Sequence, residues 1–142
     1  MDRGLKVFTL LIAIGVNPSL CFASESYSCP STVRLVSASI APEDLPAGYE
    51  PLVSNALIRL SGNNLYDGPP KEGAALKPTS YKGNVTTWML PGKYPQGVWI
   101  SCDYAEGLVK AVSRTKDSVT SCVATTEKVK PHNILAVRFV CK

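Results

Sequence analysis

Residues 97–104 read Gly-Val-Trp-Ile-Ser-Cys-Asp-Tyr, and this stretch decides the fold class of the 142-residue chain. Apolar or aromatic side chains occupy every second position from Val98 to Tyr104, while Ser101 and Asp103 lie between them. Alternation with a period of two, rich in β-branched and aromatic residues, is typical of a strand with one buried face. The stretch therefore predicts a half-buried strand that carries a cysteine into the core.

The chain after this stretch keeps the composition of strands. Clusters of turn residues separate three further strand-like runs, at 108–114, 119–126 and 134–141. Because the connections are short, these runs and 97–104 together predict a four-strand antiparallel meander at the C-terminal end.

The chain before the stretch predicts strands at 32–40, 52–60 and 85–90. Gly-Asn-Asn at 62–64 predicts a turn, since glycine and asparagine tolerate positive φ. No segment has a sustained helical period. The expected fold is mainly β, a small antiparallel sandwich or partial barrel.

The first 23 residues have the pattern of a secretory signal peptide. Arg3 and Lys6 form a positive start, residues 7–16 are apolar, and Ala23 offers a small residue before the cut. Cleavage there leaves residues 24–142 as a single exported β-domain. The segment contains two basic residues and one acidic residue, so its removal lowers the net charge from +4 to +3.

Two features argue against a membrane anchor. The apolar run at 7–16 is half the length of about 20 residues that a spanning helix needs. Cys21 follows Leu20, whereas a lipoprotein signal places a small residue before the modified cysteine. We therefore expect an exported protein without a stable membrane anchor.

Four cysteines lie after the signal segment, and an even number in an exported chain predicts two disulfides. A hairpin at residues 131–132 would place Cys122 opposite Cys141 and leave Cys29 for Cys102. The rival pairing joins Cys29 to Cys141 and Cys102 to Cys122. Both pairings stay open at the level of sequence.

The sequence offers little for catalysis or for metal binding. His132 is the only histidine, it lies in a predicted turn, and no G-x-S-x-G element accompanies it. No two cysteines have the close spacing of a zinc site, and motifs for phosphate, dinucleotide or calcium are absent. We expect no metal, no cofactor and no enzymatic activity.

Aromatic and cationic residues are interleaved in the region 66–99, namely Tyr66, Tyr81, Trp88, Tyr94 and Trp99 with Lys71, Lys77, Lys82 and Lys93. Such a mixture suits a surface for protein, carbohydrate or single-stranded nucleic acid. Export and the mild net charge argue against nucleic acid. Either the loops at 66–96 form a binding surface, or the tryptophans fill the core while the lysines keep the surface soluble.

Several short motifs together resemble a family of small bacterial periplasmic proteins. The motifs are Cys29-Pro30, Tyr-Asp-Gly-Pro-Pro at 66–70, the stretch 97–104, Thr-Ser-Cys at 120–122 and Cys-Lys at 141–142. The resemblance spans nearly the whole chain after the signal segment, and it depends on the order and spacing of these motifs. Some members of this family occur beside type VI secretion toxins. The closest functional analogy is with immunity proteins against periplasmic toxins related to L,D-transpeptidases, which attack peptidoglycan.

The resemblance implies a periplasmic protein that binds and blocks a cell-wall-targeting toxin, and it supplies no catalytic residues. The expected partner-binding residues are Tyr66, Asp67, Lys71, Glu72, Tyr81 and Tyr94. Two alternatives stay open. One is an inhibitor of a lysozyme-like enzyme, of the small periplasmic β-barrel type, and the other is a module for a glycan or small ligand that uses Trp88 and Trp99.

Overall fold

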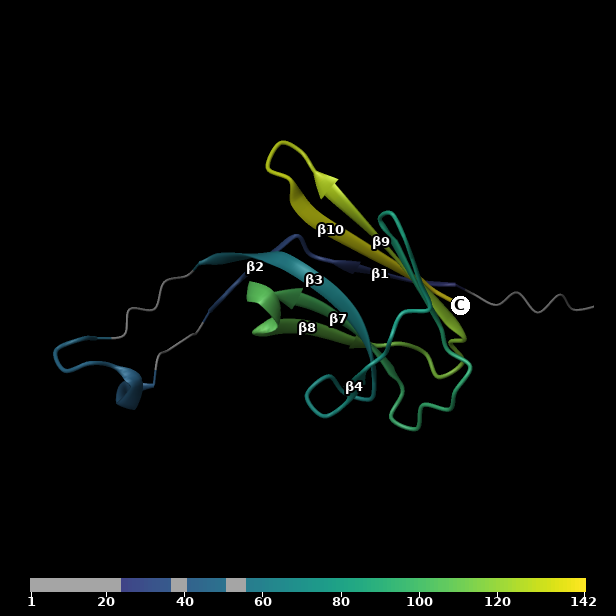
Figure 1. Cartoon of the computed structure of the whole chain (residues 1–142), viewed down its shortest axis with the longest axis horizontal. Coiled ribbons are helices and arrows are strands. Elements are labelled where there is room, and N and C mark those ends of the chain that lie inside the picture. The colour runs from purple at the N-terminus through teal and green to yellow at the C-terminus, as the bar shows by residue number, and fades with distance from the viewer. Residues whose placement is uncertain (1–23, 37–40, 51–55) are drawn as a thin grey trace, which may run out of the picture.

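The computed structural model describes residues 24–36, 41–50 and 56–142 (Figure 1). The expected signal peptide lies outside these residues, as do the end of the expected strand at 32–40 and the start of the one at 52–60. No helix within the described ranges is long and apolar enough to cross a membrane.

Ten strands in these ranges form two antiparallel sheets, which confirms the expected fold class. The first sheet has the order β1-β10-β9-β6-β5 and is built from β1 (Glu25–Cys29), β10 (Ile134–Cys141), β9 (Ser121–Val129), β6 (Val85–Met89) and β5 (Ser80–Lys82). The second has the order β2-β3-β7-β8, with β4 also paired to β3; its strands are β2 (Thr32–Arg34), β3 (Leu57–Asp67), β4 (Ala74–Ala75), β7 (Val98–Tyr104) and β8 (Val109–Arg114). Two short 3-10 helices, η1 (Pro42–Asp44) and η2 (Ala105–Gly107), complete the elements.

The stretch at 97–104 forms β7, which lies between β3 and β8 in the second sheet. Val98, Ile100, Cys102 and Tyr104 are all at most 7% exposed, as the alternation predicts. They pack with side chains from both sheets, including Leu60, Leu65, Trp88, Ala124 and Phe139. Figure 1 shows the β9–β10 hairpin on one side of the molecule and β7 with β8 on the other.

The two disulfides are Cys29–Cys102 and Cys122–Cys141, so the rival pairing is wrong. The first bond links β1 of one sheet to β7 of the other. Beside it, the Tyr104 hydroxyl donates a hydrogen bond to the carbonyl of Pro30 at 2.7 Å. The second bond joins directly opposed residues of β9 and β10 within one sheet.

The turn expected at 62–64 is wrong, because β3 runs through it as one strand of 11 residues. The register with β7 shifts between Leu60 and Gly62, which marks a β-bulge, and pairing then continues from Gly62 to Asp67. Gly62 therefore lies at an irregularity within a continuous strand, and the chain does not reverse there. This long strand pairs with β2 near its start, with β4 near its end and with β7 from Leu60 to Asp67.

The expected C-terminal meander is divided between the sheets. β8 pairs with β7, whereas β9 pairs with β10 and β6. Thr115 ends β8 by donating from its backbone N–H and its hydroxyl to the carbonyl of Val98, at 2.9 and 3.0 Å. The chain then crosses to the first sheet, where the backbone N–H of Thr120 donates to the carbonyl of Lys142 at 2.7 Å.

Candidate partner-binding site

The face of the second sheet that points away from the core is the candidate site, and we call it the outer face. Since successive side chains of a strand point to opposite faces, burial of the even residues of β7 places its odd residues on the outer face. The register sets Tyr66 of β3 and Arg114 of β8 beside Trp99. The outer face thus comprises Asn64, Tyr66, Trp99, Ser101, Asp103, Lys110, Val112 and Arg114.

A polar cluster lies at the centre of the outer face. The Ser101 hydroxyl, fully buried, donates to Oδ1 of Asp103 at 2.5 Å, and Nζ of Lys110 lies 2.7 Å from the same oxygen. The ammonium also lies 5.7 Å from the centroid of the Tyr66 ring, within the range of a cation–π contact. These contacts hold four side chains of three strands in one arrangement.

The charge of Lys110 is stabilised in this cluster. Partial burial of the ammonium works against its charge, but the contacts with Asp103 and Tyr66 outweigh that cost and raise the pKa of Lys110 above its ordinary value. The side chain is therefore a fixed cation at neutral pH.

An open groove of about 360 Å³ adjoins the cluster. It is lined by Pro69, Pro70, Lys71, Trp99, Gly107, Leu108, Lys110 and Val112. Leu108 is 89% exposed and Val112 is 47% exposed, whereas the indole N–H of Trp99 is fixed by donating to the carbonyl of Gln96 at 3.0 Å. The groove thus places an aromatic ring beside exposed aliphatic side chains and two lysines, and tryptophan is enriched at protein interfaces.

The η2 turn presents Leu108 to the groove, and its backbone is strained. Ala105 and Glu106 have φ of 46° and 55°, a region that costs side-chain-bearing residues about 1–2 kcal/mol each. Ser61 supports the turn, because its hydroxyl accepts from the N–H of Glu106 and donates to the carbonyl of Asp103, both at 3.0 Å. Strain of this kind is found more often at functional sites than elsewhere.

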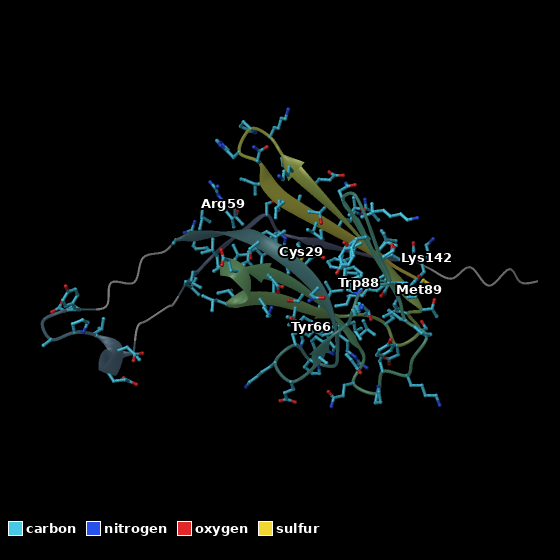
Figure 2. All side chains as sticks on the ribbon, in the orientation of Figure 1. Cys29, Arg59, Tyr66, Trp88, Met89 and Lys142 are labelled. Atoms are coloured by element: carbon cyan, nitrogen blue, oxygen red, sulfur yellow. A yellow bond between two sulfur atoms is a disulfide. The ribbon has the colours of Figure 1, made fainter. Side chains whose placement is uncertain are left out.

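The structure divides the predicted partner-binding residues. Lys71 lines the groove, and Tyr66 lies beside it through its contact with Lys110. Asp67 ends β3 opposite Val98 and therefore does not share the outer face, and Glu72 follows Lys71 in the next loop without lining the groove. Figure 2 shows Tyr66 on the side of the molecule away from the β9–β10 hairpin.

The other two predicted residues lie elsewhere. Tyr81 is on β5 in the first sheet and is 71% exposed. Tyr94 packs against the core from the loop before β7. Trp88 is 2% exposed and belongs to the core, so it is not free to bind a glycan.

Sequence reasoning missed Leu108, Lys110 and Val112. A signal was present, because Lys110, Val112 and Arg114 alternate in the run 108–114 and therefore share a face. The sequence alone does not show that Pro69 and Pro70, in the loop after β3, lie next to this face in the folded protein.

Comparison with known proteins gives one family. The model of the type VI secretion system Tli immunity protein family matches residues 54–142. The chain belongs to this family. No curated protein and no solved structure matches it.

The matched part of this Tli family member contains β3 to β10 and therefore every residue of the outer face. Membership identifies a type VI secretion immunity protein, whose partner is a cognate toxin, and it favours a binding role over an enzymatic one. It does not favour the lysozyme-inhibitor alternative. Both disulfides are consistent with a periplasmic location.

Proposed function

We propose that this protein acts in the periplasm, where it binds its cognate toxin through the groove on the outer face and blocks the toxin's active site. The observation that carries the proposal is the groove itself, where exposed Leu108 and Val112 lie beside Trp99 and two lysines. Exposed apolar side chains that gather in one hollow of the surface mark a candidate interaction site.

The site is rigid before binding, which favours affinity. Hydrogen bonds fix the Trp99 indole and the η2 turn, and the ion pair with Asp103 fixes Lys110. Side chains that are already ordered lose little conformational entropy when a partner binds. Tyr66 and Lys71 contribute to the rim of this surface, whereas Asp67, Glu72, Tyr81 and Tyr94 do not line it.

The class of the toxin is a separate proposal. The resemblance of the sequence to immunity proteins against L,D-transpeptidase-related toxins supports a target that attacks peptidoglycan. Cells that produce the toxin without this protein should then show altered peptidoglycan cross-links by mass spectrometry, with intact phospholipids. Damage to phospholipids instead would reject the cell-wall target while leaving the immunity role in place.

The site is tested by two matched substitutions. Val112 in the groove and Val129 on the β9–β10 hairpin are 47% and 50% exposed, so Val112→Asp and Val129→Asp place the same charge on equally accessible strand positions. We expect Val112→Asp to weaken binding of the purified toxin encoded beside the gene by about 30-fold, equal to about 2 kcal/mol at an interface hot spot.

Calorimetry with this toxin measures the affinity, and survival of toxin-producing cells measures protection. Val129→Asp should retain both. Equal effects of the two substitutions would place the contact elsewhere, and the absence of any complex with the wild-type protein would reject the proposed function.

A further inference from the structure

Strand β8 is a free sheet edge beside the groove. It pairs with β7 on one side, and no other strand of the described residues pairs with it. At six residues it is the longest of the five described strands that have a single partner strand, and five of its residues are exposed. Such an edge presents a row of unpaired backbone groups that a further strand can use.

The pairing fixes which backbone groups point outward. The N–H of Thr115 donates to the carbonyl of Val98, and in an antiparallel pair the residues bonded to the neighbour alternate along the strand. Ala111 and Ser113 therefore bond to β7, while the N–H and C=O groups of Lys110, Val112 and Arg114 point away from the sheet. No backbone or side-chain partner for these outward groups exists among residues 24–36, 41–50 and 56–142.

The side chains of the same three residues lie on the outer face. A strand added to this edge would place its own outer-face side chains directly beside Lys110, Val112 and Arg114, about 5 Å away. The middle side chain of the added strand would contact Val112 at the groove, and the side chains on either side of it would contact Lys110 and Arg114. Lys110 and Arg114 already pair with Asp103 and Asp117, and each keeps further N–H donors for a partner.

The charges favour a foreign strand over a second copy of this chain. If two copies paired about Val112, Lys110 of each would lie opposite Arg114 of the other, and like charges directly opposite destabilise a strand pair. A foreign strand with carboxylates opposite Lys110 and Arg114 would instead complement these two positive charges.

We infer that an extended segment of the toxin adds to β8 as a further strand, with the pattern acidic-x-apolar-x-acidic facing Lys110, Val112 and Arg114. This inference rests on the proposed function and names the mode of contact. The backbone of β8 supplies hydrogen bonds, and the groove together with the side chains of Lys110 and Arg114 selects the sequence of the segment.

Hydrogen exchange resolved by NMR at single amides tests the inference on the labelled protein, with and without the purified neighbouring toxin. We expect the amides of Lys110, Val112 and Arg114 to exchange rapidly in the free protein and to slow by at least 10-fold in the complex. The amides of Ala111 and Ser113 should be protected in both states. A complex that leaves the three amides unprotected would overturn strand addition while the proposed function stands.

Two further outcomes also overturn the inference. Protection of the three amides in the isolated protein at all concentrations would mean that the chain covers its own edge. Protection that grows with protein concentration, in the absence of toxin, would mean that the occupant is a second copy.

Val112→Pro gives an independent test, because proline removes an outward N–H and leaves the bonds to β7 intact. We expect at least 10-fold weaker toxin binding, whereas Val112→Thr, which keeps the N–H and the shape, should bind within about 3-fold of the wild type.

Arg114→Glu should weaken binding by at least 10-fold, while Arg138→Glu makes the same change in charge on the first sheet and should have little effect. These charge variants keep the inference testable if the proline variant does not fold. Equal affinity for Arg114→Glu and the wild type would contradict the acidic pattern.

Discussion

At the scale of single residues, Glu25 ties the first strand to the turn that follows β8. Its carboxylate lies 2.6 Å from Nζ of Lys116 and accepts hydrogen bonds from the Tyr27 hydroxyl at 2.5 Å and from the backbone N–H of Lys116 at 3.3 Å. The hydrogen bond from the Lys116 side chain, followed by the one from Tyr27, lowers the pKa of Glu25 below its ordinary value of 4.5. Burial, together with the bond to Glu25, raises the pKa of Tyr27 to about 12.

The lowered pKa of Glu25 predicts a loss of stability in acid. A carboxyl group whose pKa is lower in the folded state stabilises the fold above its unfolded pKa, and this contribution disappears as the pH falls through the folded pKa. Glu25→Gln should therefore reduce the drop in melting temperature between about pH 5 and pH 3. Glu127→Gln, which removes an exposed carboxylate of β9, should leave that drop unchanged, and the same slope in all three proteins would contradict this role.

At the scale of elements, the loop between β3 and β4 depends on Gly73. A Cβ atom at this position would lie 2.3 Å from the carbonyl oxygen of Asp67 and 2.8 Å from that of Gly68, and both are backbone atoms that cannot turn aside. The N–H of Gly73 also closes the loop by donating to the carbonyl of Pro69 at 2.6 Å. Pro69 lines the groove, so the packing of this glycine positions one wall of the site.

Gly73→Ala should lower the free energy of unfolding by about 1–3 kcal/mol, the usual cost of forcing atoms into a packed place. It should also weaken toxin binding, because the loop must shift. Gly62→Ala is the matched control, since a Cβ there would meet only the Cβ of Asp103 at 3.9 Å. Denaturant unfolding measures both, and an unaltered stability of Gly73→Ala would show that the loop adjusts freely.

Strands could be predicted where side-chain alternation is strong, and less well where glycine interrupts it. The alternation in 97–104 predicted β7 with the correct buried face, and the strand-like run at 134–141 predicted β10. Gly62 resembled a turn because one residue type serves both chain reversals and bulges. Only pairing with a neighbouring strand distinguishes a bulge from a chain reversal, and Asp103, the partner of Gly62, is 41 residues away in sequence.

At the scale of the whole molecule, the two disulfides differ in what they connect. Cys29–Cys102 joins the sheets across 73 residues, and Cys122–Cys141 closes a hairpin across 19. The cost of closing a loop in the unfolded chain grows with its length, so the first bond should stabilise by about 4 kcal/mol and the second by about 3.

Double substitution by alanine tests this difference, since all four cysteines are buried to a similar degree. The Cys29→Ala, Cys102→Ala variant should lose about 1 kcal/mol more in guanidinium unfolding than the Cys122→Ala, Cys141→Ala variant. A larger loss from the hairpin pair would mean that strain or residual structure outweighs loop length.

The arrangement of the sheets was less predictable than the strands. The segments 105–107 and 115–120 are both short connections in the sequence, yet the first joins neighbours in one sheet and the second crosses to the other. Likewise the groove joins the loop after β3 to the start of β8, about 40 positions apart. A site made by such a meeting has no local sequence pattern, so only the half of it near Tyr66 could be predicted.

The disulfide between Cys29 and Cys102 also implies that this immunity protein matures in two stages, before and after oxidation. Thiols stay reduced in the cytosol and become oxidised in the periplasm, so at the proposed location a newly made chain would at first lack the covalent bond between its two sheets. Toxin affinity measured for reduced and oxidised protein should then differ, with the oxidised form the tighter. We expect the cell to synthesise the immunity protein with reduced cysteines and to form its disulfides only outside the cytosol. The protein would then mature in the same compartment in which it is proposed to protect the cell.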